Sequence, residues 1–324
     1  MSLATPSAMS PDELREFREG RGESQGAFAL WLNGRLGRKY DNATISRWES
    51  GAERIPAKVA EFLTAEANRV ARIIAIANQK GGVGKTTTTL NLAYALGELG
   101  KRVLVVDADQ QATATEGAGL DPMDVQDRRS GLEDVLFGET ELRDAIVPRD
   151  GFDILPCTIA LAEAQIKILL DPDDGRYILR EKLAEVQRDY DFILIDCPPE
   201  LALITVSALI AADHLLIPTK ASRYDVRGIP LIFDTVAKIQ RRQNPSLTIL
   251  GILPTMFNRN YAVEQQVLAD LQALLGTRAR IFPPVPRSTE IDQATYAGEL
   301  PLKVLPKTHP VTVYRTLAKE IAYG

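Results

Sequence analysis

Residues 79–89 read QKGGVGKTTTT, and this stretch decides the fold. It follows an apolar, strand-like run, IIAIA at 73–77, and it opens a helical pattern over residues 90–99. In that setting a glycine-rich loop wraps backbone N–H groups around a phosphate chain, and a helix N-terminus points at the same anion. The stretch therefore predicts a nucleoside triphosphate site in preference to a simple glycine-rich turn.

Each part of this loop has an expected role. The glycines permit positive φ and a close approach of the backbone to the ligand. Lys85 is expected to reach the β and γ phosphates, and the Thr86 hydroxyl to bind a Mg²⁺ ion. The residues expected to contact the nucleotide here are Gly81, Gly82, Val83, Gly84, Lys85, Thr86 and Thr87.

Lys80 stands just before the two glycines, where an ordinary phosphate loop does not require a lysine. With it, the run KGGVGKTT resembles the deviant Walker A motif of the ParA/MinD family of ATPases. The resemblance implies ATP and Mg²⁺ as cofactors and an ATP-dependent homodimer. It also implies that Lys80 reaches the nucleotide of the other subunit, while Lys85 acts on its own. Both amines would neutralise phosphate charge during hydrolysis. The alternative for Lys80 is a solvated loop lysine.

Two further strand-like runs lead into aspartates. VLVV at 103–106 precedes Asp107-Ala108-Asp109, and FILI at 192–195 precedes Asp196-Cys197-Pro198-Pro199. An aspartate at the carboxyl end of a buried parallel strand can serve a Mg²⁺ site beside the loop. Asp196 resembles the Walker B aspartate, and the two prolines resemble the switch that follows it. The resemblance makes Asp109 the residue that orients or activates water, and Asp107 an outer Mg²⁺ ligand. A turn or helix cap is the alternative for each aspartate.

Two more segments are compared with the same family. Its members read D-P-Q-G-N or close to it after the second strand, whereas this chain has Asp109-Gln110-Gln111-Ala112-Thr113. The carboxylate is retained, so hydrolysis is expected, while the loss of proline and glycine should change the stiffness of the loop. MFNR at 256–259 and PVPR at 284–287 resemble segments near the adenine base, and Asn258 is the residue expected to contact the nucleotide there.

Composition limits the class of protein. No apolar run is long enough to span a bilayer, and residues 1–30 lack the pattern of a secretory signal. The two cysteines form no C-x-x-C pair, which argues against the iron–sulfur carriers of the same family. A cytoplasmic, nucleoid-associated protein is expected. The net charge of −5 means that any contact with nucleic acid must come from a local basic patch.

The pattern changes along the chain. Residues 1–10 are expected to be a disordered tail, residues 11–70 read as helical, and residues 71–324 alternate strands with helices. Further strand-like runs lie at 214–218 and 247–253, with helical patterns at 176–188, 226–242, 262–275 and 310–322. This alternation predicts an α/β fold, a mostly parallel sheet with helices on both faces, preceded by a small all-α domain.

The helical segment resembles the Cro/repressor type of helix-turn-helix. Ser24 would cap one helix, and NATISRWE at 42–49 followed by Ser-Gly would form the next. The resemblance places the later helix in the major groove, with Ile45 and Trp48 packed inward. The residues expected to contact DNA are Gln25, Asn42, Thr44, Ser46 and Arg47. The stretch 33–41 is longer than the usual turn, and eleven Arg and Lys nearly balance ten Asp and Glu over residues 1–72. A module for dimerisation or partner docking is the alternative.

ParA-type ATPases also bind DNA without sequence preference through basic residues of the dimer. The candidates here are Lys238, Arg241, Arg242, Arg259, Arg278 and Arg280. Solvated helix ends are the alternative. The last helix, with Val313, Leu317 and Ile321 at helical spacing, is expected to close the core. A MinD-type membrane anchor is less favoured, because its two basic residues are partly offset by Glu320.

Together, these features predict a DNA-partition ATPase, weak by itself and stimulated by DNA or by a ParB-like partner at a centromere-like site. The N-terminal module would bind operator DNA and regulate the protein's own operon. Two other functions stay open: a transcription regulator that uses the nucleotide only as a ligand, and a MinD-like ATPase that positions another cargo.

Overall fold

A computed structural model describes residues 9–170, 175–199 and 202–324. The chain divides into two compact units, Met1–Arg69 and Val70–Gly324, and each is described by itself. The expected tail at 1–10 falls mostly outside the described residues. Of the two tail residues that are described, Ser10 caps the first helix by accepting a hydrogen bond from the Glu13 amide.

The described residues of the first unit are helical, with short connections. The helices are α1 (Pro11–Gly20), α2 (Gln25–Leu36), α3 (Asn42–Glu49) and α4 (Ala57–Ala67). Ser24 caps α2, as predicted. Helix α2 continues to Leu36 and ends at Gly37, whose φ of 61° is left-handed, so the connection to α3 spans only residues 37–41. Ile45 and Trp48 are buried, which confirms the predicted inward face of α3.

A seven-stranded sheet forms the centre of the second unit. Its strands are β1 (Arg72–Ile76), β2 (Val103–Asp107), β3 (Val147–Pro148), β4 (Asp153–Leu155), β5 (Phe192–Asp196), β6 (His214–Lys220) and β7 (Thr248–Thr255). The order is β3-β4-β2-β5-β1-β6-β7, and every neighbouring pair is parallel except β3 with β4. The prediction of a mostly parallel sheet is therefore confirmed.

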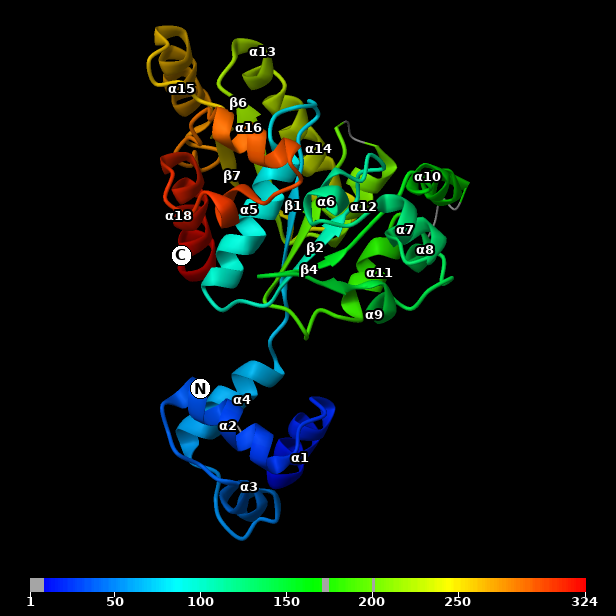
Figure 1. The fold of residues 1–324 in the computed structure, drawn as a ribbon, viewed down its shortest axis with the longest axis vertical. Coiled ribbons are helices and arrows are strands. Elements are labelled where there is room, and N and C mark those ends of the chain that lie inside the picture. Colours follow the sequence, from blue (N-terminus) through cyan, green and yellow to red (C-terminus); the bar gives the residue numbers. More distant parts are fainter. Residues whose placement is uncertain (1–8, 171–174, 200–201) are drawn as a thin grey trace. The chain divides into compact units, whose positions relative to one another are not determined.

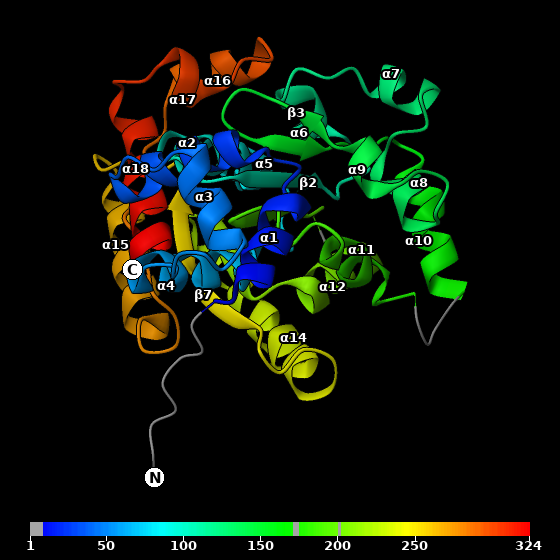
Figure 2. The same ribbon diagram turned by 90° about the horizontal axis from the view of Figure 1, so that it is seen from below.

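Helices cover both faces of this sheet, also as predicted (Figures 1 and 2). One face carries α5 (Lys85–Glu98), α17 (Pro301–Val304) and α18 (His309–Tyr323). The other carries α11 (Ile178–Ala184), α12 (Leu203–Ala211) and α14 (Ile229–Arg242). The other helices are α6 (Thr113–Gly117), α7 (Pro122–Asp127), α8 (Leu132–Leu136), α9 (Leu142–Ala145), α10 (Leu161–Leu170), α13 (Arg223–Val226), α15 (Ala262–Leu275) and α16 (Thr289–Tyr296).

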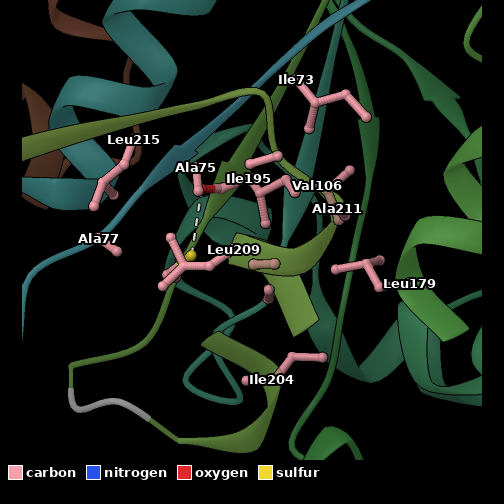
Figure 3. Close-up of a cluster of buried hydrophobic side chains, with 14 of the residues drawn as sticks. Ile73, Ala75, Ala77, Val106, Leu179, Ile195, Ile204, Leu209, Ala211 and Leu215 are labelled. Atoms are coloured by element: carbon pink, nitrogen blue, oxygen red, sulfur yellow. Dashed lines mark hydrogen bonds between the residues drawn. The ribbon is translucent and has the colours of Figure 1, made fainter. Parts of the chain in front are cut away.

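The central strands are apolar throughout because both of their faces are buried. Successive side chains of a strand point to opposite faces, so Ile74 and Ile76 join the cluster beneath α5. Ile73 and Ala75 join the cluster beneath α12, which also contains Leu209 (Figure 3). This double burial fixes β1, and with it the start of the glycine-rich loop.

Helix α18 closes the core, which confirms the prediction for the last helix. Of the three residues named in the prediction, Leu317 and Ile321 are buried in the cluster that includes α5, and Val313 is partly buried against it. The Thr88 and Tyr314 hydroxyls lie 3.5 Å apart across this contact. No helix in the described part of the chain has the length and apolarity that crossing a membrane requires.

Candidate nucleotide site

The loop that follows β1 leads directly into α5. Gly82 and Gly84 have φ of 66° and 82°, the left-handed region that glycine adopts without strain. The Thr255 hydroxyl, at the end of β7, donates to the Val83 carbonyl at 2.8 Å and steadies the loop from the side. Among the described residues, the amides of 81–87 have no hydrogen-bond acceptor. Such a row of free amides at a helix N-terminus suits an anion.

Four functional side chains meet beneath the loop. Lys85 is only 7% exposed, and its Nζ donates to the Lys80 carbonyl at 3.4 Å. Burial lowers the pKa of Lys85, while the charges of Asp196 and Asp109 oppose that shift. The Thr86 hydroxyl donates to Asp196 Oδ2 at 2.7 Å. The structure thus brings together Lys85, Thr86, Asp109 and Asp196 around one end of the sheet.

Asp107 and Asp196 end neighbouring strands and pair in register. Both are fully buried. Burial, and next the charge of Asp107, raise the pKa of Asp196 to about 7. Burial likewise raises the pKa of Asp107 to about 6. Two buried carboxylates so close together favour a bound cation, because a cation stabilises their charged forms.

The donor set fits Mg²⁺. A hydroxyl, a carboxylate and the phosphate oxygens of a nucleotide are the hard oxygen ligands that this ion takes, often with several waters. Thr86 and Asp196 supply the first two. In the described part of the chain no group of three or more His, Cys, Asp or Glu is arranged to hold a metal ion.

Asp107 has partners on both oxygens. Its Oδ2 accepts from the Thr115 amide and hydroxyl, both at 2.8 Å, and its Oδ1 accepts from the Asp109 amide at 3.2 Å. It therefore ties the end of β2 to α6 and to the loop between them. Asp109 is 7% exposed, and its Oδ1 accepts from the Gln111 amide at 3.1 Å.

Ala112 sits in this loop with a φ of 53° and is the N-cap of α6. The corresponding position in the D-P-Q-G-N pattern is glycine. A residue with a Cβ in the left-handed conformation costs about 1–2 kcal/mol. The departure from the family pattern therefore leaves local strain five residues from the end of β2 and three from Asp109.

Lys80 is held by its own subunit in this structure. Its Nζ donates to the Tyr224 carbonyl at 2.5 Å and pairs with Asp225 Oδ1 at 3.2 Å. Asp225 lies on α13 and accepts a hydrogen bond from the Ser222 hydroxyl. The Lys80 side chain remains 36% exposed. Its action on a second subunit stays a prediction.

Asn258 follows β7, whose last residue contacts the loop. The Asn258 amide donates to Glu264 Oε2 at 2.6 Å, and its Oδ1 accepts from the Asn260 amide at 3.0 Å. These bonds shape the turn into α15. Asn258 thus lies at the same edge of the sheet as the loop, and its contact with a base stays a prediction.

The predicted DNA contacts of the first unit differ in exposure. Asn42, Ser46 and Arg47 are exposed on α3, and Arg47 pairs with Glu53 at 2.8 Å. Thr44 is half-buried and donates to the Asp41 cap at 2.6 Å. Gln25 instead donates to Glu49 Oε2 at 2.8 Å, inside the unit.

The basic residues predicted to bind DNA in the second unit fall into three places. Lys238, Arg241 and Arg242 are exposed on α14, and Arg278 lies over the ring of Phe233 on that helix, 4.7 Å from its centre. Arg280 instead pairs with Glu320 of α18 at 2.7 Å. Arg259 is exposed in the turn before α15. Arg278 therefore joins the exposed basic residues of α14 in one surface group, called the α14 group below. The charge of Arg280, by contrast, is compensated by an acid.

Other residues at the site were not identified from the sequence. The Thr89 hydroxyl donates to Asp196 Oδ1 at 2.9 Å, and its position one turn after Thr86 was the available signal. Asn78 donates to the Pro218 carbonyl at 2.7 Å and accepts from the Lys80 amide at 3.1 Å. Thr255 comes from a distant strand, so no local pattern could identify it.

Known proteins match the second unit. The model of the family described as AAA domain matches residues 71–249. The chain is 37% identical over 255 residues to the sporulation initiation inhibitor protein Soj of Bacillus subtilis, covering 78% of this chain and 98% of that protein. It is 38% identical over 250 residues to the chromosome-partitioning ATPase Soj of Thermus thermophilus, covering 77% and 95%.

A solved structure agrees. Cobyrinic acid a,c-diamide synthase of Mycobacterium smegmatis, with a bound ATP analogue and magnesium, superposes with a TM-score of 0.67. It is 33% identical and covers 78% of this chain and 94% of that one. The family match begins at residue 71, so the helices of the first unit lie outside it. By sequence, fold and loop, the chain belongs to the ParA/Soj/MinD family of ATPases.

Proposed function

We propose that this protein is a DNA-partition ATPase that dimerises when it binds ATP. ATP and Mg²⁺ are its cofactors, and the relative from Mycobacterium smegmatis holds an ATP analogue and magnesium on the same fold. The observation that carries the proposal is the group formed by the buried Lys85 and Asp196 with the half-buried Thr86, beneath free loop amides and with Lys80 nearby.

The residues divide the work of hydrolysis. The loop amides and Lys85 would bind the phosphates, and Thr86 with Asp196 would hold a Mg²⁺ ion, which would neutralise the charge that develops on the phosphates. Asp109 orients the attacking water. Lys80 leaves Asp225 and binds the nucleotide of a second subunit. Nucleotide binding and dimerisation therefore strengthen each other.

The dimer then binds DNA without sequence preference through the α14 group, and a ParB-like partner stimulates a weak ATPase and releases the DNA. The name of the Thermus thermophilus relative, a chromosome-partitioning ATPase, supports this assignment. The first unit acts as a helix-turn-helix in which α3 reads an operator, since Asn42, Ser46 and Arg47 are exposed on it. A cytoplasmic, nucleoid-associated location follows.

A transcription regulator that uses the nucleotide only as a ligand is the second candidate. The exposed polar face of α3 favours it. A MinD-like membrane anchor is not favoured, because the apolar residues of α18 pack on α5. The regulator would hold one operator tightly, with a turnover that no partner changes.

The test is the mass of the protein with and without a nucleotide. Light scattering with Mg²⁺ and a non-hydrolysable ATP analogue should give a dimer for the native chain and a monomer for Lys85→Ala. Lys182→Ala, on α11, is the matched control. Coating of nonspecific DNA should follow the dimer. An unchanged mass of the native chain would refute the proposal, and DNA coating by Lys85→Ala would refute the ATP switch.

A further inference from the structure

A third lysine lies against the phosphate loop. Lys220 is the last residue of β6, and β6 is the neighbour of β1 on the side away from β5. Its Nζ is 3.7 Å from the point where a Cβ on Gly82 would stand. The point where a Cβ on Gly81 would stand is 3.9 Å from Pro199 Cβ. The loop is therefore flanked by Pro199 on one side and by the Lys220 ammonium on the other.

The three lysines around the loop differ in their partners. Lys80 is bound to α13, and Lys85 donates to a carbonyl of the loop. The side-chain ammonium of the half-buried Lys220 has no hydrogen bond or ion pair with any described residue. Asp225, the nearby acid on α13, is already engaged by Lys80 and Ser222.

Such an arrangement is electrostatically unfavourable without a ligand. Asp225 compensates the charge of Lys80, and the charges of Asp196 and Asp109 attract Lys85. The Lys220 ammonium has no such described partner, and the positive N-terminal end of the α5 dipole repels it. A polyanion in the loop would offset this repulsion, and an ammonium binds phosphate oxygens through charge-assisted hydrogen bonds. The free ammonium over Gly82 is therefore best explained by a contact with bound phosphate.

We propose that Lys220 binds the phosphate chain of the nucleotide held in the loop of its own subunit. This rests on the proposed nucleotide site. Lys85 approaches from the buried base, and Lys220 approaches from the carboxyl end of the neighbouring strand. Lys80 is then the lysine left to reach a second subunit.

The test compares Lys220→Gln, Lys220→Arg and Lys182→Gln. Affinity for a fluorescent ATP analogue with Mg²⁺ is measured by titration at two salt concentrations, and the apo proteins are melted as a check of folding. Lys220→Gln should bind about tenfold more weakly, a typical loss for one charged hydrogen bond. Lys220→Arg should recover most of the affinity, and Lys182→Gln should match the native chain. The tenfold difference in affinity between the native chain and Lys220→Gln should be smaller at the higher salt concentration.

Two results would overturn the inference: Lys220→Gln binding as tightly as the native chain, or Lys220→Arg binding as weakly as Lys220→Gln while both melt normally. The second would mean that the shape of the lysine, and not its charge, supports the loop. Failure of the native chain itself to bind the analogue would instead refute the proposed nucleotide site, which Lys85→Ala tests separately.

Discussion

The two units hold buried charge in opposite ways. In the first, Glu49 is 4% exposed and accepts from Arg18 Nε at 2.5 Å and from Gln25 at 2.8 Å. Burial acts to raise the pKa of Glu49, but the hydrogen bonds from Arg18 and Gln25 hold it below its ordinary value. In the second, burial raises the pKa of Asp196 and lowers that of Lys85, so the charged form is disfavoured in both.

This difference separates a structural ion pair from a ligand site. The charge of Glu49 is satisfied within the protein. The charges of Asp196 and Lys85 are not, although the two residues attract each other. Buried groups whose pKa values move towards the neutral form mark places where function requires a charge that the fold does not stabilise by itself. Here the missing stabilisation is what a metal–nucleotide complex supplies.

Glu49→Ala should have the largest effect on stability. It leaves Arg18 nearly buried without its main partner, and breaking such a pair costs about 3–5 kcal/mol. Hydrogen exchange over residues 9–69 should show that the first unit opens, while nucleotide binding stays unchanged. The matched control is Glu53→Ala, which breaks the half-exposed pair with Arg47 and should cost about 0–1 kcal/mol. Equal losses in the two variants would contradict the comparison.

Lys85→Ala should act on the ligand and spare the fold. Removing a buried charge that binds phosphate costs about 2–5 kcal/mol of affinity, at least about thirtyfold. The melting temperature of the apo protein should hardly change, because burial already disfavours the ammonium. Calorimetric titration with ATP and Mg²⁺, together with thermal melting, measures both quantities. A large drop in apo stability would mean that Lys85 is a structural group like Glu49.

The same contrast explains what the sequence could predict. Central strands such as β1 read as unbroken apolar runs because both faces are buried, so the sheet could be predicted. Lys85 and Thr86 lie in one contiguous motif, and their place follows from it. Strands β3 and β4, of two and three residues, are too short for a pattern. The pairing of Lys80 with Asp225 and the approach of Lys220 to Gly82 depend on β6 lying beside β1, which periodicity does not specify.

Asp225→Asn tests the role of the pair between Lys80 and Asp225. It weakens the hold of α13 on Lys80, a partly exposed pair worth about 0.2–1 kcal/mol. Because Lys80 must leave Asp225 to reach a second subunit, and a dimer releases two such pairs, dimerisation with ATP should tighten about two- to thirtyfold. Sedimentation over a range of protein concentrations measures the constant, with the exposed Asp234→Asn on α14 as control. Weaker dimerisation would instead mean that α13 positions Lys80 for the partner.

Ala112→Gly should have the smallest effect. Glycine relieves the left-handed strain, which costs about 1–2 kcal/mol. Glycine also makes the unfolded chain more flexible, and this lowers the folding stability by about 0.5–1 kcal/mol. The net gain of about 0.5 kcal/mol should raise the melting temperature by about 1–2 °C. Ala114→Gly, inside α6, should lower it, because glycine in a helix costs about 1 kcal/mol. If Ala112→Gly also lowers the melting temperature, the loop that holds Asp109 is not strained. The departure from the family pattern would then affect turnover through Gln110, which replaces the proline.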